Sequence, residues 1–473
     1  MTLEAFIGLV MLLVLLGAIF IGVPISFTLL FLAFSFGYLG MGATVFDLAY
    51  FQTIGMMKEE LLAAVPLFIF MGFITEQAGL MERLFTAFRL ILAPVRGALY
   101  LVVVLTATVF AMATGIVGAA VTVLGIMASP IMIKSGYDAK LSAGTITAGG
   151  TLGILIPPSV MLIVMGPVLG VSVADLYAAA FGPGFLLAGI YVVYLMARSI
   201  WNPKLGPPVP KEERVHSFGM MLREVVVGVV PLIGLITATL GSILAGLATP
   251  TEASGIGTVG ALALALAYRK LSFGGLQRAL TATMSTTSMV LLLAVTSNIF
   301  GAVFARLGTA NWITNTLLSF ELPPMFMLVM VLLLIFLLGW PFEWPAIVLV
   351  FLPIFYPVVA ALKIDMIWFG ALTAVTLQTA FLSPPVAMSA YYLKQVVKDW
   401  SLATIYNGMF QFMILQVICI GLLIYFPQIS LWFPQRLQAA ARAEKIPEEY
   451  QKIIEQQRNR PSTMYEDDYG TKK

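Results

Sequence analysis

Long uncharged apolar stretches recur along almost the whole chain, and they restrict its fold more than any other feature. A helix needs about 20 mostly apolar residues to cross the hydrocarbon core of a bilayer. Only 10% of the 473 residues are charged and 60% are hydrophobic, whereas a soluble domain carries about 25% charged residues. Plain apolar stretches cover 3–22, 25–42, 61–80, 175–200, 224–247, 251–268, 279–306 and 403–427. We therefore predict an all-α polytopic membrane protein.

Reactive side chains are scarce, and this excludes several function classes. A single cysteine, Cys419, and a single histidine, His216, exclude a disulfide framework, the usual zinc sites and most nucleophile–histidine chemistry. A net charge of +3 provides no basic face for nucleic acid. We therefore expect no enzyme and no catalytic residues. An intramembrane enzyme stays as a remote alternative, and a channel is disfavoured.

Four further apolar stretches are interrupted near their middle by Gly and Pro, and they belong to an internal repeat. They cover 98–130, 138–171, 326–358 and 365–397. Residues 136–161 run parallel to 363–388 with an offset of 227, which places Pro157-Pro158 over Pro384-Pro385. Adding 227 to the plain first-half stretches reproduces the second-half ones. One unit of about 200 residues is therefore used twice.

Each unit is predicted to contain three helices, an interfacial arm helix, a re-entrant hairpin, a broken helix and a final helix. That unit crosses the membrane five times, and an odd number of crossings inverts the second copy. Two full crossings in place of each hairpin would also give an odd number. Length favours re-entrance, because Leu101 to Ser129 provides two half-depth arms and not two complete spans.

The irregular backbone is confined to part of each copy, and this divides the chain into two bodies. Alternating access requires one body to carry the site past another, so we expect an elevator-type transporter. The predicted parts are a scaffold (1–96 and 224–321), a transport domain (97–200 and 322–427), a cytoplasmic loop (201–223) and a polar C-terminal tail (428–473).

The distribution of Lys and Arg predicts the orientation. With the N-terminus outside, the inner loops of the body collect fifteen basic residues and the outer ones three. Basic residues are enriched on the cytoplasmic side of membrane proteins. We therefore expect both termini to lie outside. We also expect the first stretch to be a retained helix, since it lacks a signal-peptide pattern.

The break at Pro157-Pro158 predicts an ion site. Proline has no backbone N–H, so the carbonyls of Gly153 and Ile154 lose their helical donors. Such a break persists in a membrane only where protein, water or an ion replaces the lost bond. Free carbonyls beside the Thr151 and Ser159 hydroxyls suit Na⁺. The helix that restarts at Ser159 favours an anion at its N-terminus.

The second copy repeats this arrangement. Pro384-Pro385 frees the carbonyls of Ala380 and Phe381, and the two hairpin turns are predicted at 112–118 and 339–344. Four irregular pieces of this kind match the general plan of secondary transporters, with the substrate at the repeat interface. For either break alone, a proline kink with a packing role remains an alternative.

Other residues carry weaker signals. Glu343 is the only acid in a hairpin turn; it is either functional or a capping or interfacial residue at a turn that reaches water. Residues 249–252 indicate a helix start with proline in the first turn. Gly255, Gly257 and Gly260 are expected to allow close helix packing.

These motifs resemble the large membrane subunit of tripartite ATP-independent periplasmic transporters. The resemblance covers about residues 1–434 and rests on 148–159, 182–184, 249–253, 383–386 and 426–431. It implies the permease subunit of a Na⁺-driven importer of organic acids in the bacterial inner membrane. It also implies two partners, a small four-helix membrane subunit and a soluble periplasmic substrate-binding protein. A self-sufficient divalent-anion/sodium symporter shares the hairpin plan and remains the alternative.

The resemblance also implies where ions and substrate bind. The Na⁺ sites would lie near Thr114, Gly115, Gly149, Gly150, Thr151, Gly153, Gly339, Thr379, Ala380 and Ser383. The substrate-binding candidates are Thr114, Ser159, Glu343, Gln378 and Ser383. Two segments, 113–116 and 379–385, depart from the serine-rich and glycine-rich patterns of many members. This variant is more similar to the branch linked to 2-oxo, hydroxy and aromatic acids.

Overall fold

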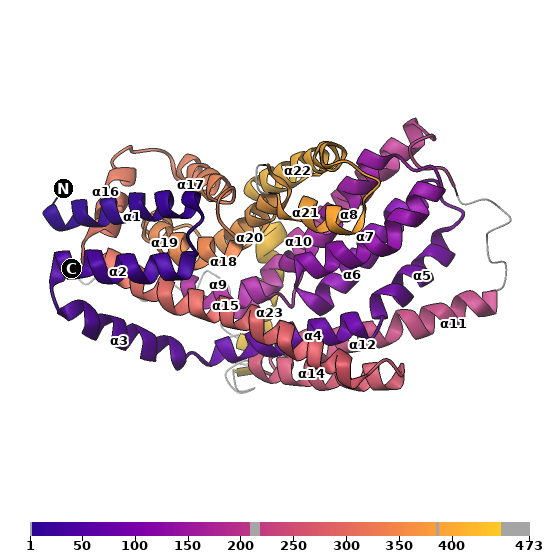
Figure 1. The fold of residues 1–473 in the computed structure, drawn as a ribbon, viewed down its shortest axis with the longest axis horizontal. Helices are drawn as coiled ribbons and strands as arrows, with labels where there is room; N and C mark the ends of the chain where they lie inside the picture. Colours follow the sequence, from indigo (N-terminus) through magenta and orange to yellow (C-terminus); the bar gives the residue numbers. More distant parts are fainter. Residues whose placement is uncertain (1, 209–217, 385–386, 446–473) are drawn as a thin grey trace, which may run out of the picture.

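The computed structural model describes residues 2–208, 218–384 and 387–445, and these residues form helices and their connections (Figure 1). Eight of the described helices are long and apolar enough to cross a membrane, or nine if the bent pair described below is one span. The predicted all-α polytopic membrane protein is confirmed. His216 and the rest of 209–217 in the predicted 201–223 loop lie outside the described residues. Residues 218–223, predicted as loop, are helical and begin α11 (Phe218–Gly228).

The first part of the predicted scaffold contains four long helices and the predicted arm. The helices are α1 (Leu3–Ile21), α2 (Ile25–Met41), α3 (Thr44–Met57), the short 3₁₀ helix η1 (Glu60–Ala63), α4 (Ala64–Gln77) and α5 (Leu80–Leu92). The Thr2 hydroxyl caps α1 by accepting from the Ala5 N–H at 3.2 Å. The sequence reading did not predict α3 as a separate helix. The predicted arm helix of the first copy is α5, with charges on one side and buried leucines on the other.

The first interrupted region forms a helical hairpin, a broken helix and a long final helix. Its elements are α6 (Ala98–Thr114), α7 (Val117–Lys134), α8 (Ala139–Leu155), α9 (Val160–Leu169) and α10 (Val173–Trp201). The α8–α9 pair is bent by 45°. The hairpin arms have 17 and 18 residues, about 26 Å each. The expectation of half-depth arms is therefore wrong in length, and length does not separate a re-entrant hairpin from two crossings.

The second half follows the same order. It contains α11 (Phe218–Gly228), α12 (Val230–Ile236), η3 (Thr237–Gly241), α13 (Ser242–Leu244), α14 (Pro250–Ala267), α15 (Phe273–Arg306), α16 (Thr309–Leu318), α17 (Pro324–Leu338), α18 (Trp344–Ala346), η4 (Ile347–Phe351), α19 (Leu352–Ala361), α20 (Met366–Leu382), α21 (Met388–Val396), α22 (Leu402–Tyr425) and α23 (Gln428–Lys445). The last of these extends the helical body into the predicted tail and packs on α10.

In the predicted scaffold α15 packs against α2, α3 and α4, while α14 packs on α4. The predicted helix start at 249–252 is confirmed, because Thr249 and Glu252 form a capping box. Gly257 provides close packing, since a β-carbon there would lie 2.5 Å from Met71 Sδ. Gly255 does not, because its β-carbon would meet no atom within 4 Å.

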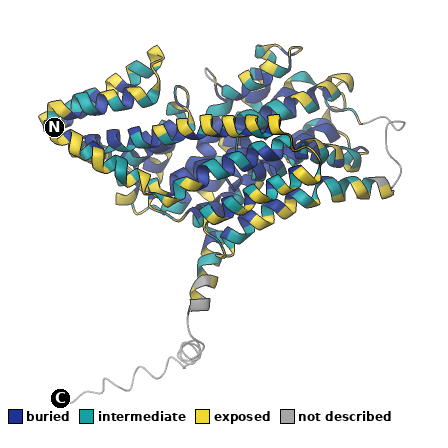
Figure 2. Ribbon diagram, turned by 60° about the horizontal axis from the view of Figure 1, so that its bottom comes forward, coloured by how far each residue is buried: buried dark blue, intermediate teal, exposed yellow. Residues whose placement is uncertain are grey.

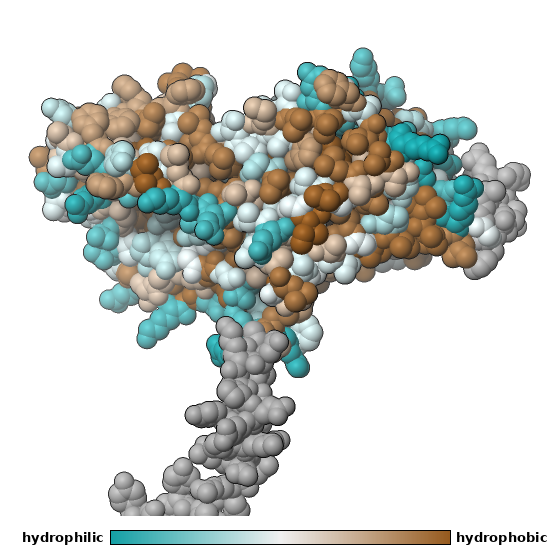
Figure 3. Space-filling view, turned by 90° about the horizontal axis from the view of Figure 1, so that it is seen from below, coloured by the Kyte–Doolittle hydropathy of each residue, from teal (hydrophilic) through white to brown (hydrophobic). Residues whose placement is uncertain are grey.

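The most buried helix is α8, which lies between α6, α7 and α22. Every residue from Leu141 to Leu155 is buried, and Figure 2 shows the buried residues gathered on the central helices. Gly144 and Gly408 let the α8 and α22 backbones approach, because a β-carbon at Gly144 would lie 2.7 Å from the Gly408 carbonyl oxygen. The outer surface is largely apolar, as Figure 3 shows for one face, and this agrees with a lipid environment.

Candidate functional site

The first hairpin turn lies against the first broken helix. Gly115 is the C-cap of α6 and has φ +61°, a conformation that favours glycine. A β-carbon at Gly115 would lie 3.5 Å from the Pro158 carbonyl oxygen, 3.8 Å from that of Gly153 and 3.8 Å from the Val160 N. The turn therefore meets both ends of the break. Thr114 ends α6, but its side chain falls outside the described part of the structure.

A glycine face of α8 makes this contact possible. A β-carbon at Gly150 would lie 2.3 Å from Val121 Cγ2 and 3.0 Å from Val121 N, and one at Gly149 would lie 3.2 Å from Ala107 Cβ. At Gly153 the nearest atom would be the Ile116 N at 3.8 Å. All three glycines thus face the hairpin, and the first two allow its arms to approach the α8 backbone.

The hydroxyls of the first break already have partners. Ser159 Oγ donates to the Ile154 carbonyl at 2.5 Å, so this carbonyl is not free as predicted. Thr151 Oγ1 donates to the Ala148 carbonyl at 2.8 Å. Thr151 lies about 200° around α8 from Gly149, so it points away from the hairpin face. The Gly153 carbonyl, which faces the turn and has lost its helical donor, is the better ligand candidate.

The second hairpin turn also lies against its own broken helix. A β-carbon at Gly339 would lie 2.6 Å from Ala380 Cβ. Thr379 Oγ1 donates to the Thr376 carbonyl at 2.5 Å, within α20. Ser383 is buried, and its hydroxyl has no hydrogen-bond partner among the described residues. Pro385 and Val386 of the predicted motif lie outside the described residues.

Gln378 faces away from this turn. It is completely buried, and its Oε1 accepts from Gln416 Nε2 of α22 at 3.5 Å. It lies about 200° around α20 from Ala380. Since Gln378 and Thr151 are 227 residues apart, both copies turn this position away from their hairpins. The structure therefore does not bring Gln378 together with Glu343 or Ser159 at a hairpin turn.

Glu343 lies in the turn before α18 and lines a cavity of about 210 Å³ with Gly339, Ala380 and Phe381. Its side chain is exposed and forms no capping hydrogen bond, which disfavours the capping alternative. The sequence reading missed Tyr392 of α21. A β-carbon at Gly118 of α7 would lie 3.1 Å from Cζ of its ring, so Tyr392 connects the first hairpin to the second broken helix. In the sequence, the only indication of a role for Tyr392 is that it follows shortly after the second Pro-Pro motif.

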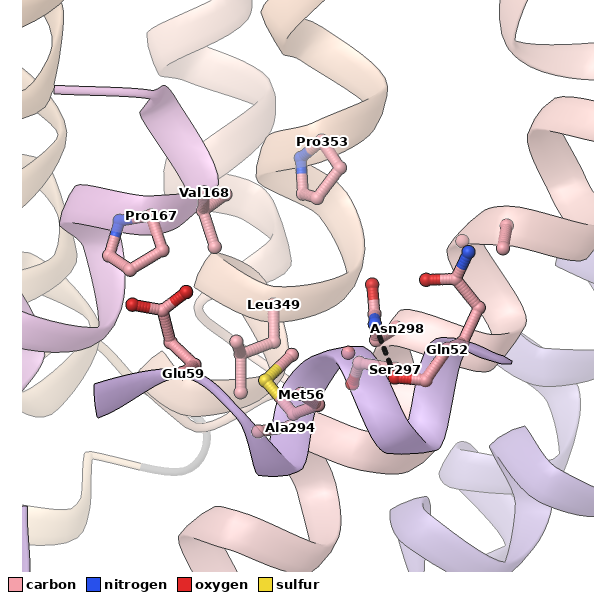
Figure 4. Close-up of a pocket in the computed structure, with 13 residues that line it drawn as sticks. Gln52, Met56, Glu59, Pro167, Val168, Ala294, Ser297, Asn298, Leu349 and Pro353 are labelled. Carbon is pink, nitrogen blue, oxygen red and sulfur yellow. Dashed lines mark hydrogen bonds between the residues drawn. The ribbon is translucent and has the colours of Figure 1, made fainter. Parts of the chain in front are cut away.

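A cavity of about 480 Å³ lies between the two predicted bodies (Figure 4). The predicted scaffold contributes Gln52, Glu59 and Asn298, and Asn298 Nδ2 donates to the Gln52 carbonyl at 3.3 Å. Pro167 and Val168 of α9 lie on the opposite wall, with further residues from η4 and α19. The end of the first broken helix therefore borders a space shared with the scaffold.

Metal-binding side chains are not clustered in the part of the chain that the structure describes: no three His, Cys, Asp or Glu residues come together. The oxygens available at the breaks are backbone carbonyls and hydroxyls. These suit a hard monovalent cation, and the first turn of α9 at Ser159 suits an anion.

Comparison with known proteins agrees with these features. Residues 9–429 match the model of the tripartite ATP-independent periplasmic transporter, DctM component. The chain is 30% identical to the sialic acid TRAP transporter large permease protein SiaM of Vibrio cholerae, with 89% of this chain and 96% of the relative covered. It is 32% identical to the C4-dicarboxylate large permease protein DctM of Pseudomonas aeruginosa over 80% of this chain and 86% of the relative.

A solved structure shares the fold. The Alcanivorax borkumensis YdaH transporter aligns with a TM-score of 0.56 at 16% identity, covering 83% of this chain and 89% of that one. The relatives are transporter permeases and not enzymes. The chain therefore belongs to the DctM family, the large permease subunits of tripartite ATP-independent periplasmic transporters.

Proposed function

We propose that this chain is the permease subunit of a Na⁺-coupled secondary transporter that imports a small organic acid by an elevator mechanism. It works in the bacterial inner membrane with both termini outside. A periplasmic substrate-binding protein delivers the acid, and a small four-helix membrane subunit supports the scaffold. Two relatives are named for sialic acid and for C4-dicarboxylates, and both ligands are organic acids.

One observation carries the proposal: each hairpin turn touches the broken helix of its own half. Gly115 lies against Gly153 and Pro158, and Gly339 lies against Ala380. In the first half the Gly153 carbonyl, which has lost its helical donor, is thereby held close to a second irregular segment. Such oxygens bind Na⁺ without any acidic side chain.

The elevator mechanism is supported by the arrangement of the two halves. Helix α20 lies 227 residues after α8 at both ends: the two helices begin at 139 and 366 and end at 155 and 382. The two halves also contact each other, since α8 packs on α22 and α9 on η4. This pairing favours a single transport domain that moves against α3 and α15, with the 480 Å³ cavity between them.

Uptake by proteoliposomes that contain this chain, its small membrane partner and the binding protein tests the proposal. Uptake of an organic acid should require an inward Na⁺ gradient and all three components. Uptake without the binding protein would instead support the self-sufficient symporter. Uptake independent of Na⁺ would contradict the assignment of the breaks as ion sites.

A crosslink tests the movement. Cysteines at Asn298 and Val168, in a Cys419→Ala background, should abolish uptake when joined by a bismaleimide, because they fix the scaffold to α9. Cysteines at Asn298 and Gln52 serve as the control, since both belong to the scaffold and already share a hydrogen bond. Full uptake with the first pair joined would refute the elevator mechanism. Binding-protein docking should survive both crosslinks.

A further inference from the structure

Arg198 near the end of α10 has a charge that the described chain does not balance. Its Nη1 donates to Tyr194 Oη at 2.9 Å and to Gln411 Oε1 at 3.4 Å, and both acceptors are neutral. It forms no ion pair with any described residue. A guanidinium has five N–H donors, and a half-buried cation beside lipid is costly without an anion. An anion from outside the chain would balance the charge of the Arg198 guanidinium.

An apolar groove between α10 and α22 leads to Arg198. It has a volume of about 480 Å³ and is lined by Phe185, Leu186, Gly189, Ile190, Val193, Tyr194 and Leu415. Gly189 leaves the groove open, because a β-carbon there would meet no atom within 4 Å. Phe185 and Val193 form its walls and are 47% and 69% exposed. A groove of this composition suits a hydrocarbon chain.

The groove and the cation meet at Tyr194. Tyr194 belongs to both, since its ring lines the groove and its hydroxyl accepts from Arg198. Phe185 and Arg198 are separated by 13 residues, or about 20 Å of helix. Trp201, which is 82% exposed, ends the helix three residues later, and exposed tryptophans favour the level of the lipid headgroups.

We propose that this surface binds one anionic phospholipid. An acyl chain lies along the groove from Tyr194 towards Phe185, and the phosphate accepts from the free N–H groups of Arg198. A soluble phosphate would use the cation and leave the groove empty. A zwitterionic lipid would fill the groove and gain less from Arg198, because its headgroup carries its own cation.

Thermal unfolding of the purified full-length chain with its small partner tests the site. Phosphatidylglycerol added to the detergent should raise the unfolding temperature by about 3 °C or more, and phosphatidylcholine with the same acyl chains should raise it less. Arg198→Gln should remove the difference between the two lipids, and Arg198→Lys should keep most of it. Gly189→Leu should abolish both shifts, because its side chain fills the groove.

Two variants serve as controls. Arg278→Gln removes an exposed arginine elsewhere, and Gly17→Leu fills an equally open glycine position on α1. Both should retain the wild-type response. Equal shifts with the two lipids in the wild type would overturn the proposal, as would loss of the response in either control. A shift with glycerol phosphate alone would show an anion site without a lipid chain and would also overturn it. All these readouts are independent of transport.

Discussion

Both halves of the molecule bring a hairpin turn against a broken helix, but they place their glycines differently. In the first half glycines lie on both sides of the contact, with Gly115 in the turn and with Gly149, Gly150 and Gly153 of α8 facing the hairpin. The positions 227 residues later are Thr376, Leu377 and Ala380. In the second half the close approach instead depends on Gly339 in the hairpin turn, which meets Ala380.

This difference shows that the contact, and not a particular residue, is what both halves retain. A close approach of two backbones requires a missing side chain on only one of them. It also makes the two contacts unequal. The first break exposes the Gly153 carbonyl to the turn at van der Waals distance, whereas Ala380 places a methyl group between α20 and Gly339. We therefore expect the first contact to contribute more to Na⁺ binding.

The largest effect is expected for Gly150→Leu. The new side chain collides with the Val121 backbone, so the hairpin must move away from α8 at a cost of about 3 kcal/mol or more. The remaining uptake should require more Na⁺, and the Na⁺-induced thermal shift should shrink. The same substitution at Gly255, which is open, provides the control. A loss of stability with unchanged Na⁺ dependence would reduce the first break to a packing kink.

Gly339→Ala tests the second contact. Its β-carbon would lie 2.6 Å from Ala380 Cβ, so we expect a loss of about 1–3 kcal/mol. Adding Ala380→Gly moves the missing side chain to the helix, as in the first half, and should recover stability despite a helix penalty of about 1 kcal/mol. Thermal unfolding of the single and double variants measures this coupling. Additive losses would show that the two positions do not form the contact.

The serines of the two breaks should differ in their effect on stability. Ser159→Ala leaves the buried Ile154 carbonyl without its hydroxyl donor, at a cost of about 1–3 kcal/mol. Ser383→Ala removes a hydroxyl that has no described partner and should have little effect on the unfolding temperature. Its effect on uptake should be larger than its effect on stability if Ser383 contacts ion or substrate. The reverse ranking of the two unfolding temperatures would contradict this comparison.

Thr151→Ala is expected to have the smallest effect. The hydroxyl donates to the Ala148 carbonyl within α8 and points away from the hairpin face, so the cost should stay below about 1 kcal/mol. The Na⁺ dependence of uptake should change much less than in Gly150→Leu. A comparable change in both variants would place Thr151 among the ion ligands.

The sequence predicted the spans and breaks well, because both depend on local composition. Apolar length located the spans, and the interrupted stretches 138–171 and 365–397 begin where Asp138 and Asp365 cap α8 and α20. The apolar pattern predicted that α15 begins at 279 rather than at 273, because Gln277 and Arg278 interrupt the pattern in its first turns. The two arms of the first hairpin were predicted within 101–129, whereas α6 and α7 extend from Ala98 to Lys134.

The candidate site was only partly predictable. Proline identified the carbonyls that lose their helical donors, but it did not show that Ser159 would return a donor to Ile154. The direction in which the Gln378 side chain points could not be predicted either, since a helix that is buried on all sides has no polar face to orient it. Tyr392 was not predicted because its contact with Gly118 joins segments that are far apart in the sequence.

The most direct test of the central claim, that the first hairpin turn and broken helix form a Na⁺ site, is the half-saturating Na⁺ concentration for uptake. Gly115→Ala puts a methyl group between the turn and Pro158, whereas Gly170→Ala has a similar φ of +63° with open space around it. Both variants carry the same backbone strain, so only the contact differs. The account predicts a rise of about threefold or more for Gly115→Ala, equivalent to about 0.6 kcal/mol of binding, and no change for Gly170→Ala. Equal values in both variants would contradict it.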